Sequence, residues 1–315
     1  MTDDIIVSVK CMVFNHEQYL RQCLEGFVMQ KTDFKYEVII HDDASTDSSA
    51  KIIKEYANKY PEIVKPIFEA HNQYSVGGFY RVINIMNRCI KGKYIALCEG
   101  DDYWTDDCKL QKQVDYMESH GECGLVYTRM KELNQLTGKM AVGWSRQADF
   151  EQIIAGENPI CTPTVMFQKT LYDSYFRDVD INPHWMMADY PLWIYLSYKS
   201  KIKCLDDITT VYRSLPTSAS HSADIIKMFA FAESGYTIST FFADKFRCGH
   251  LQNKITQRTI NSLFKLSLSH DKNISSDIVK FAYKNGKISV LILFKALLYS
   301  NNIGRKFIRN KYSII

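Results

Sequence analysis

The sequence predicts an α/β fold in which helices flank a mostly parallel sheet, followed by a helical C-terminal region. Short runs of Val, Ile and Leu alternate with helical patterns over about the first hundred residues. This alternation is typical of βαβ units. Beyond Ser222 the apolar spacing is helical throughout. With 315 residues, 46% of them hydrophobic, the chain is long enough to bury a large core.

The first half of the chain contains four expected strands, each followed by a helical pattern. An apolar run with few breaks suits a strand that is buried on both faces, and apolar residues three and four apart indicate a helix. Gly92 is expected to end the third helix. The expected strands are 5–13, 36–40, 64–68 and 94–98, and the expected helices are 15–30, 47–60, 79–90 and 106–119.

The pattern is less regular in the second half. A polar, Gly-containing stretch at 130–148 is expected to be a loop, and loops of that length are often functional lids. The boundaries expected on this basis are an α/β domain over 1–221 and a helical region over 222–315. The further expected elements are strands at 124–128, 162–167, 202–205 and 208–213, and a helix at 189–198.

Composition excludes several classes of protein. Charged residues make up 23% and aromatic residues 13%, which fits a globular rather than a disordered chain. The nine cysteines show no C-x-x-C spacing, and several lie in apolar runs, so we expect buried free thiols of a reducing compartment. The acidic N-terminus leads directly into a strand, unlike a signal peptide. A cytoplasmic location is therefore expected.

The basic residues are concentrated at the C-terminus. After Asp277 there are eight Lys and Arg residues and no acid, so the net charge of +4 leaves −4 for residues 1–277. The apolar run 288–299 is interrupted by Lys295 and is shorter than the roughly 20 residues that span a bilayer. It suits a helix lying on an anionic membrane surface, or equally a helix packed on the domain. Nucleic acid is not an expected partner, because no binding motif is present.

Two acidic clusters follow two of the expected strands. Residues 42–47 read D-D-A-S-T-D, and residues 99–102 read E-G-D-D. Open α/β sheets bind ligands at the carboxyl ends of their strands, so the clusters can form one acidic pocket. Such a pocket suits a divalent cation and, through it, a phosphorylated ligand. The alternative is a pair of Asp-rich turns that cap helices, and Asp47 is expected to be such a cap.

The second cluster suggests particular ligands. Glu99 and Asp101 are expected to share a face, because alternate residues of an extended segment point the same way. Acidic side chains alone repel a nucleotide diphosphate, so binding one requires Mg²⁺ or Mn²⁺. Tyr103 and Trp104 could form a wall over a base or sugar, or could equally pack in the core.

In this order, the motifs resemble those of the inverting nucleotide-sugar glycosyltransferases of family 2, which have the GT-A fold. The resemblance covers about residues 5–215 and implies a catalytic domain over 1–221, with a nucleotide-sugar half at about 1–105 and an acceptor half at about 106–221. The matching segments are V-F-N-H-E at 13–17, D-D-A-S-T-D for the family's D-D-G-S-T-D, E-G-D-D for its D-x-D-D metal motif, and M-A-D-Y-P-L-W at 187–193 for its E-D-Y-x-L-W.

The resemblance also implies roles for individual residues. Asp189 would be the catalytic base, Asp43 would accept a hydrogen bond from uracil, Asp101 would hold the ribose or diphosphate, and Asp102 would ligate the metal. His221 is a further candidate for the metal, although a lone His is more often structural. The other residues placed at the donor are Phe14, Asn15, Glu17, Asn84 and Arg213.

The implied activity is metal-dependent, inverting transfer from a UDP-sugar to a hydroxyl of a glycan or lipid-linked acceptor in polysaccharide biosynthesis. If the basic tail binds membrane, a peripheral location on its inner face is expected. Glu99 replaces the usual Asp, Ala188 replaces the acid that commonly precedes the base, and Ile83 replaces an Arg. Two of these departures, Glu99 and Ala188, keep open a non-catalytic nucleotide- or sugar-binding protein. A sugar nucleotidyltransferase is disfavoured, since residues 13–20 lack the Gly-rich basic loop that it needs.

Overall fold

The structure is a computed structural model that describes residues 4–215, 222, 224–301, 304–306 and 308. This part of the chain forms two compact units. The first contains residues 4–150, 159–183 and 195–214. The second contains the described residues of 151–158, 184–194 and 215–308. Two short segments that precede residue 221 thus belong with the C-terminal helices.

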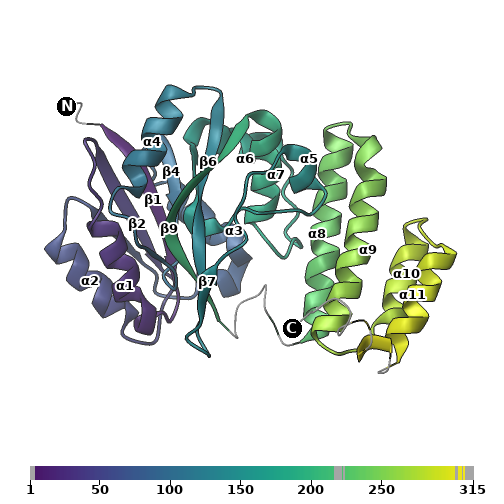
Figure 1. The fold of residues 1–315 in the computed structure, drawn as a ribbon. Coiled ribbons are helices and arrows are strands. Elements are labelled where there is room, and N and C mark those ends of the chain that lie inside the picture. The colour runs from purple at the N-terminus through teal and green to yellow at the C-terminus, as the bar shows by residue number, and fades with distance from the viewer. Residues whose placement is uncertain (1–3, 216–221, 223, 302–303, 307, 309–315) are drawn as a thin grey trace. The chain divides into compact units, whose positions relative to one another are not determined.

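A nine-stranded mixed sheet forms the first unit (Figure 1), in the order β3-β2-β1-β4-β8-β6-β9-β5, with β7 paired to β6. The first four strands in this order are parallel, as the βαβ pattern predicts, whereas β8 runs antiparallel to both β4 and β6. The strands are β1 Ile5–Val13, β2 Lys35–Asp42, β3 Val64–Phe68, β4 Tyr94–Leu97, β5 Tyr103–Trp104, β6 Cys123–Asn134, β7 Met140–Val142, β8 Met166–Gln168 and β9 Lys201–Ser214.

Helices cover both faces of the parallel strands. Val38 and Ile40 of β2 pack in one core with residues of α1, α2 and α4, whereas Ile39 between them packs against Val82 and Met86 of α3. Alternate side chains of a strand point to opposite faces, so this split explains the unbroken apolar run. The helices with residues in this unit are α1 Glu17–Val28, α2 Ser49–Lys59, α3 Gln73–Asn87, α4 Lys109–Ser119, α6 Lys169–Asp178 and parts of α5 Phe150–Ile154 and α7 Asp189–Lys199.

The structure corrects several local predictions. The expected loop at 130–148 is in part a hairpin, because β6 continues to Asn134 and pairs with β7. The strands expected at 202–205 and 208–213 form one strand, β9, which pairs with β6 along most of its length across register shifts. The β6–β9 pairing joins distant segments, so it leaves no local apolar pattern.

Gly92 does not end the helix before it, because α3 ends at Asn87. A Cβ at Gly92 would lie 2.4 Å from the Ser8 amide nitrogen, so glycine is required there for β1 to pass closely. α3 also begins earlier than expected and is kinked at Gly77 and Gly78. The short 3-10 turn Thr162–Thr164 replaces the start of the strand expected at 162–167.

The second unit is helical, which confirms the helical C-terminal region. Its own core includes Ile260 and Phe264 of α9, Phe281 of α10 and Ile292 of α11. Within the described residues, no helix combines the length and the apolar character that crossing a membrane requires. Its main helices are α8 Ile225–Lys245, α9 Gln252–Ser269, α10 Ser275–Lys284 and α11 Val290–Ser300.

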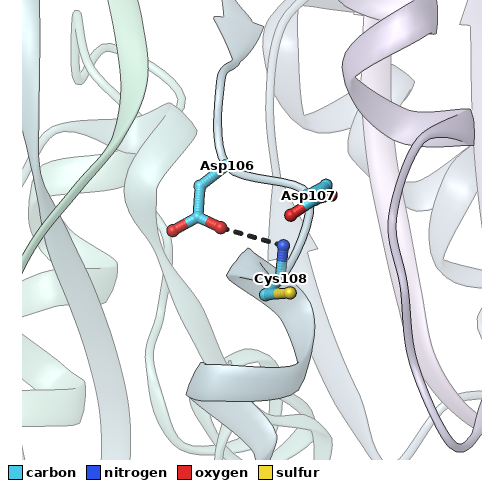
Figure 2. A group of neighbouring side chains, drawn as sticks. All are labelled: Asp106, Asp107 and Cys108. Carbon is cyan, nitrogen blue, oxygen red and sulfur yellow. Dashed lines mark hydrogen bonds between the residues drawn. The ribbon is translucent and has the colours of Figure 1, made fainter.

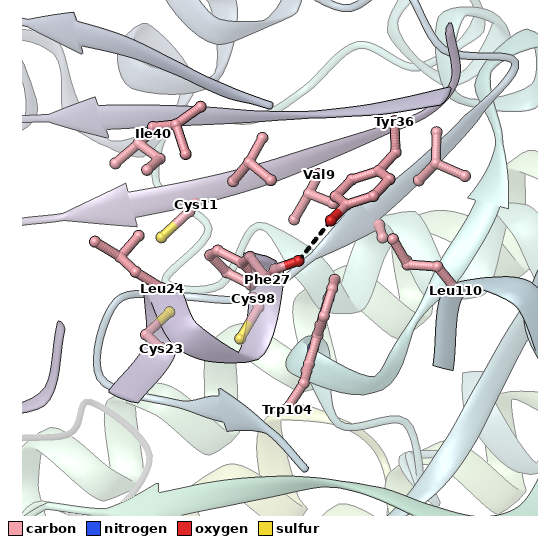
Figure 3. Close-up of a cluster of buried hydrophobic side chains, with 14 of the residues drawn as sticks. Val9, Cys11, Cys23, Leu24, Phe27, Tyr36, Ile40, Cys98, Trp104 and Leu110 are labelled. Carbon is pink, nitrogen blue, oxygen red and sulfur yellow. Dashed lines mark hydrogen bonds between the residues drawn. The ribbon is translucent and has the colours of Figure 1, made fainter. Parts of the chain in front are cut away.

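Trp104 belongs to the core of the first unit rather than to a wall over a ligand (Figure 3). Its ring meets Phe27 edge-on with centroids 4.9 Å apart, and its Nε1 donates to the Pro163 carbonyl at 2.8 Å. Cys11, Cys23 and Cys98 lie in the same core. Six of the nine cysteines are buried, but Cys89 is exposed and Cys108 and Cys248 are half-buried, so the expectation of buried thiols holds only in part.

Two lysines are buried in the first unit. Lys109 donates to Gln113 Oε1 at 2.6 Å, and its Nζ lies 4.4 Å from the centroid of the Trp104 ring. Lys10 donates to Asn87 and Tyr172. Burial lowers the pKa of each ammonium group to about 7, since an apolar surrounding disfavours the charged form. Both lysines therefore lower stability, most of all below the folded pKa, and this cost falls as the pH rises toward the unfolded pKa.

We expect Lys109→Met to flatten the pH dependence of stability. The folded pKa lies below the unfolded one, so the free energy of unfolding rises with pH between them, and Lys109 contributes about 1 kcal/mol per pH unit to that slope between roughly pH 7.5 and 9. Urea unfolding across this range measures the loss of that contribution. Lys112→Met, at a partly exposed ion-paired lysine, should keep the slope. An unchanged slope in Lys109→Met would show that Lys109 keeps its ordinary pKa.

Candidate functional site

The loops that follow β1 and β2 are tied together by paired hydrogen bonds between side chains and backbone. The backbone N–H of Asn15 donates a hydrogen bond to Ser45 Oγ at 2.9 Å, and the side-chain Oδ1 of Asn15 accepts one from the backbone N–H of Thr46 at 2.8 Å. We call residues 15–17 with 45–49 the loop clasp. It brings the first acidic cluster beside the end of β1, where the donor residues are predicted.

Glu17 completes the loop clasp in the same way. Its amide donates to Asp47 Oδ2 at 2.9 Å, and its Oε2 accepts from the Ser48 amide at 2.8 Å. Asp47 Oδ1 accepts from the Ser49 amide at the start of α2, so Asp47 supports this helix end as expected, although the N-cap position itself is Ser48. The side chains of Asn15 and Glu17 thus shape the loop, while Phe14 beside them is 45% exposed.

Two residues of these loops have left-handed backbone conformations, Asn15 with φ +56° and Ala44 with φ +60°. Asparagine adopts this region readily, whereas the Cβ of alanine meets the following carbonyl. Ala44 stands where the D-D-G-S-T-D motif has glycine. The loop therefore keeps the conformation that suits glycine although the residue is alanine.

Asp43 caps α3. Its carboxylate accepts from the amides of Gln73 at 2.6 Å and Tyr74 at 3.0 Å, and its carbonyl accepts from Asn72 Nδ2. Helix N-termini carry amides without partners in the helix, so this carboxylate fixes the first turn of α3. Asn84 lies on α3 itself and is also predicted to bind the sugar donor; its side chain is exposed. Asp43 thus joins the end of β2 to the start of α3.

The second cluster, residues 99–102 after β4, is called the acidic edge here. Asp102 is 2% exposed, and its Oδ1 accepts from the Arg213 amide at 2.7 Å. Burial first, and the neighbouring Asp101 carboxylate second, raise the pKa of Asp102 well above its ordinary value. Asp101 Oδ1 is buried and has no hydrogen-bond partner in the described part of the chain. The acidic edge therefore holds carboxylate charge that its surroundings compensate poorly.

These carboxylates fit a divalent cation. A buried oxygen without a partner costs free energy, and so does a buried carboxylate with a second carboxylate beside it, as at Asp102. Mg²⁺ and Mn²⁺ prefer oxygen ligands and remove both penalties. Asp102 is thus the residue that would hold such an ion, with the Asp101 carboxylate beside it.

A third acidic group follows β5, at Asp106, Asp107 and Cys108 (Figure 2). Its ligand atoms lie within 4.8 Å of one another. Asp106 accepts from the Cys108 amide at 2.9 Å and pairs with Lys112 at 2.6 Å, while Asp107 pairs with Lys31 at 2.5 Å. Lysines already compensate these carboxylates, so this turn is a weaker candidate than the acidic edge.

Arg213, on β9, is held beside the acidic edge. Its guanidinium lies between the rings of Tyr103 and Tyr19, at 4.6 and 5.1 Å from their centroids, and donates to Gln22 Oε1 at 2.5 Å. Aromatic faces attract a cation at such distances. Tyr103 thus packs on Arg213 rather than on the core alone. The predictions missed Tyr19 and Gln22, although their spacing of three on α1 places both on one side of that helix.

Asp189 is in the second unit, at the first residue of α7. It is half-buried, and its Oδ1 accepts from the Tyr190 amide at 2.7 Å. Tyr190 anchors this turn, because its hydroxyl bonds to the Ile153 carbonyl and Ser239 Oγ, each at 2.8 Å. His221, the second predicted metal ligand, lies outside the described residues.

The chain is similar in sequence to a known protein family and to several individual proteins. Residues 8–175 match the model of the family described as Glycosyl transferase family 2. An uncharacterized protein of Mycobacterium tuberculosis is 35% identical over 222 residues, which cover 69% of this chain and 61% of that protein. The putative glycosyltransferase EpsE of Bacillus subtilis is 29% identical over 191 residues, covering 60% and 65%. The chain thus spans less than two thirds of the length of these relatives.

Solved structures share the fold. Residues 1–349 of Staphylococcus aureus TarS in complex with UDP-GlcNAc align with a TM-score of 0.59 and 17% identity, covering 94% of this chain and 90% of that one. The mannosyltransferase PcManGT from Pyrobaculum calidifontis, in complex with GDP-Man and Mn²⁺, aligns with a TM-score of 0.56 and 14% identity, covering 100% and 89%. At these identities the likeness concerns the fold.

We expect Ala44→Gly to raise the free energy of unfolding by about 0.5–1 kcal/mol, because relief of the left-handed strain exceeds the entropy that glycine adds to the unfolded chain. Urea unfolding measures the change. As a control, Ala57→Gly inside α2 should lower stability by about 1 kcal/mol or more. If both variants lose stability alike, Ala44 is not strained.

Proposed function

The chain belongs to glycosyl transferase family 2, as its motifs predict, and from this premise we propose that it is a metal-dependent inverting glycosyltransferase. The donor is a nucleotide-diphosphate sugar, with UDP favoured by the motif resemblance, and the acceptor is a hydroxyl of a glycan or lipid-linked saccharide. The observation that carries the proposal is the acidic edge, where Asp101 Oδ1 lacks a partner and the pKa of Asp102 is raised. TarS with UDP-GlcNAc and PcManGT with GDP-Man and Mn²⁺ support this class of donor.

The donor half binds and orients the nucleotide sugar. Asp102 would hold the divalent cation, and Asp101 would contact the ribose or diphosphate. The bound cation supplies positive charge for the diphosphate leaving group. Arg213, fixed by Gln22 and two tyrosine rings, adds a second positive charge next to Asp102. Phe14 and Asp43 would contact the nucleoside.

Asp189 supplies the base. Its carboxylate takes the proton from the acceptor hydroxyl, whose oxygen then attacks the anomeric carbon from the face opposite the diphosphate. The bond to the diphosphate breaks as the new glycosidic bond forms, so the configuration inverts. General-base help of this kind is worth about 10²–10⁴-fold in rate. Ala188, which stands where the family commonly has an acid, leaves Asp189 as the carboxylate of this motif.

We expect UDP to stabilise the protein in the presence of Mn²⁺, by about 2.7 kcal/mol when UDP is at one hundred times its dissociation constant. Asp102→Asn should weaken this binding at least tenfold, because the neutral amide loses the charge that attracts the cation. Thermal unfolding with and without Mn²⁺ measures both effects, with GDP and dTDP as competing nucleotides.

Asp107→Asn is the matched control, because it removes one carboxylate from the lysine-paired turn instead. It should bind UDP as the parent protein does. If Asp107→Asn loses binding and Asp102→Asn keeps it, the cation site is misplaced. If no nucleotide stabilises the folded protein with metal present, the result favours the alternative of a non-catalytic protein on a transferase fold.

We expect Asp189→Asn to lower transfer at least a hundredfold while leaving metal-dependent donor binding intact, because the amide cannot accept the proton. Nucleotide release from the sugar conjugate that stabilises the protein most measures the rate, and thermal unfolding measures binding. Asp180→Asn, at an exposed aspartate, should turn over normally. Unchanged turnover in Asp189→Asn would remove this residue from the role of base.

A further inference from the structure

The last helix described in full, α11, is apolar on opposite sides. Ile292 and Ala296 are buried in the core of the second unit. The rest of the helix carries a second apolar surface that the described residues leave exposed. Its members, here called the α11 face, are Val290, Leu291, Leu293, Phe294 and Leu297, with exposed fractions of 84%, 62%, 48%, 56% and 67%.

The α11 face is one continuous stripe. At 100° per residue, Val290, Phe294 and Leu297 lie within about 60° of one another around the helix axis, on the side opposite Ile292. A helix that is apolar all round belongs in a core or at a membrane, since water penalises the second face. Clustered exposed apolar side chains of this kind mark an interaction surface.

The charge around the α11 face is positive. Lys284 is exposed at the end of α10, the neighbouring helix in Figure 1. Lys295 is half-buried and lies at the edge of the apolar stripe, where a long side chain can extend toward the headgroup region. The sequence has no acidic residue after Asp277. Neither Lys284 nor Lys295 forms an ion pair with a described residue.

We propose that the α11 face, with Lys284 and Lys295, docks on an anionic lipid leaflet. α11 has 11 residues and is therefore about 16 Å long, too short to span the roughly 30 Å of bilayer hydrocarbon, so it lies in the plane of the interface. Phe294 and Leu297 enter the acyl boundary while the lysines meet anionic headgroups. Charge favours this partner over a second copy, because two copies joined through this face would bring their own lysines together.

Vesicle flotation of the full chain tests the proposal, with phosphatidylcholine alone and with added phosphatidylglycerol. We expect binding only to the anionic vesicles and its loss as salt rises. Phe294→Ser with Leu297→Ser should weaken binding at least tenfold. Lys284→Gln with Lys295→Gln should weaken it about fivefold per lysine. These four side chains lie outside the buried core, so the thermal midpoint should stay unchanged.

Matched controls remove the same groups elsewhere on the chain. Leu136→Ser with Val142→Ser removes two exposed apolar residues of the first unit, and Lys51→Gln with Lys227→Gln removes the same charge, so both should float as the parent does. Equal binding to neutral vesicles, or unchanged binding in both α11 variants, overturns the proposal. So does a dimer in light scattering that Phe294→Ser with Leu297→Ser dissociates, because a second copy would then cover the face.

Discussion

The hydrogen bond from the Arg213 amide to the Asp102 carboxylate is the contact on which the candidate donor site depends. It joins residues 111 positions apart and brings the end of β9 against the acidic edge after β4. The guanidinium of Arg213 lies between Tyr103 and Tyr19, so this positive charge and the carboxylates of the acidic edge share one end of the sheet. The buried carboxylates exceed what this single amide can compensate, which is why the edge suits a divalent cation.

Several features of the first unit lower its stability. Ala44 holds a left-handed conformation, Asp101 keeps a buried oxygen without a partner among the described residues, and two lysines lie in apolar surroundings. The loop clasp and the cap that Asp43 gives α3 oppose these costs with charge-assisted hydrogen bonds to backbone amides. Strain near a site and compensation beside it are a common arrangement in functional proteins.

Elements of the fold could be predicted from the sequence wherever the pattern that indicates them lies within a short segment of the chain. The apolar runs of β1 to β4, the acidic turns after β2 and β4, and the hydrogen bond from the start of α2 to Asp47 each leave their pattern within about ten residues. Contacts between distant segments were not predictable. The β6–β9 pairing, the capping of α3 by Asp43 and the clamp around Arg213 join residues that no periodicity connects. The motif resemblance names the expected site residues, but it carries no information about their partners.

Anomalous diffraction from crystals of the full chain grown with Mn²⁺ and UDP tests the central claim most directly, because it locates the cation without assuming any activity. We expect one manganese peak at about 2–2.5 Å from a carboxylate oxygen of Asp102, with the UDP diphosphate on its other side. A peak at Asp106 and Asp107 with none at the acidic edge would contradict the account. So would UDP bound at the acidic edge without manganese.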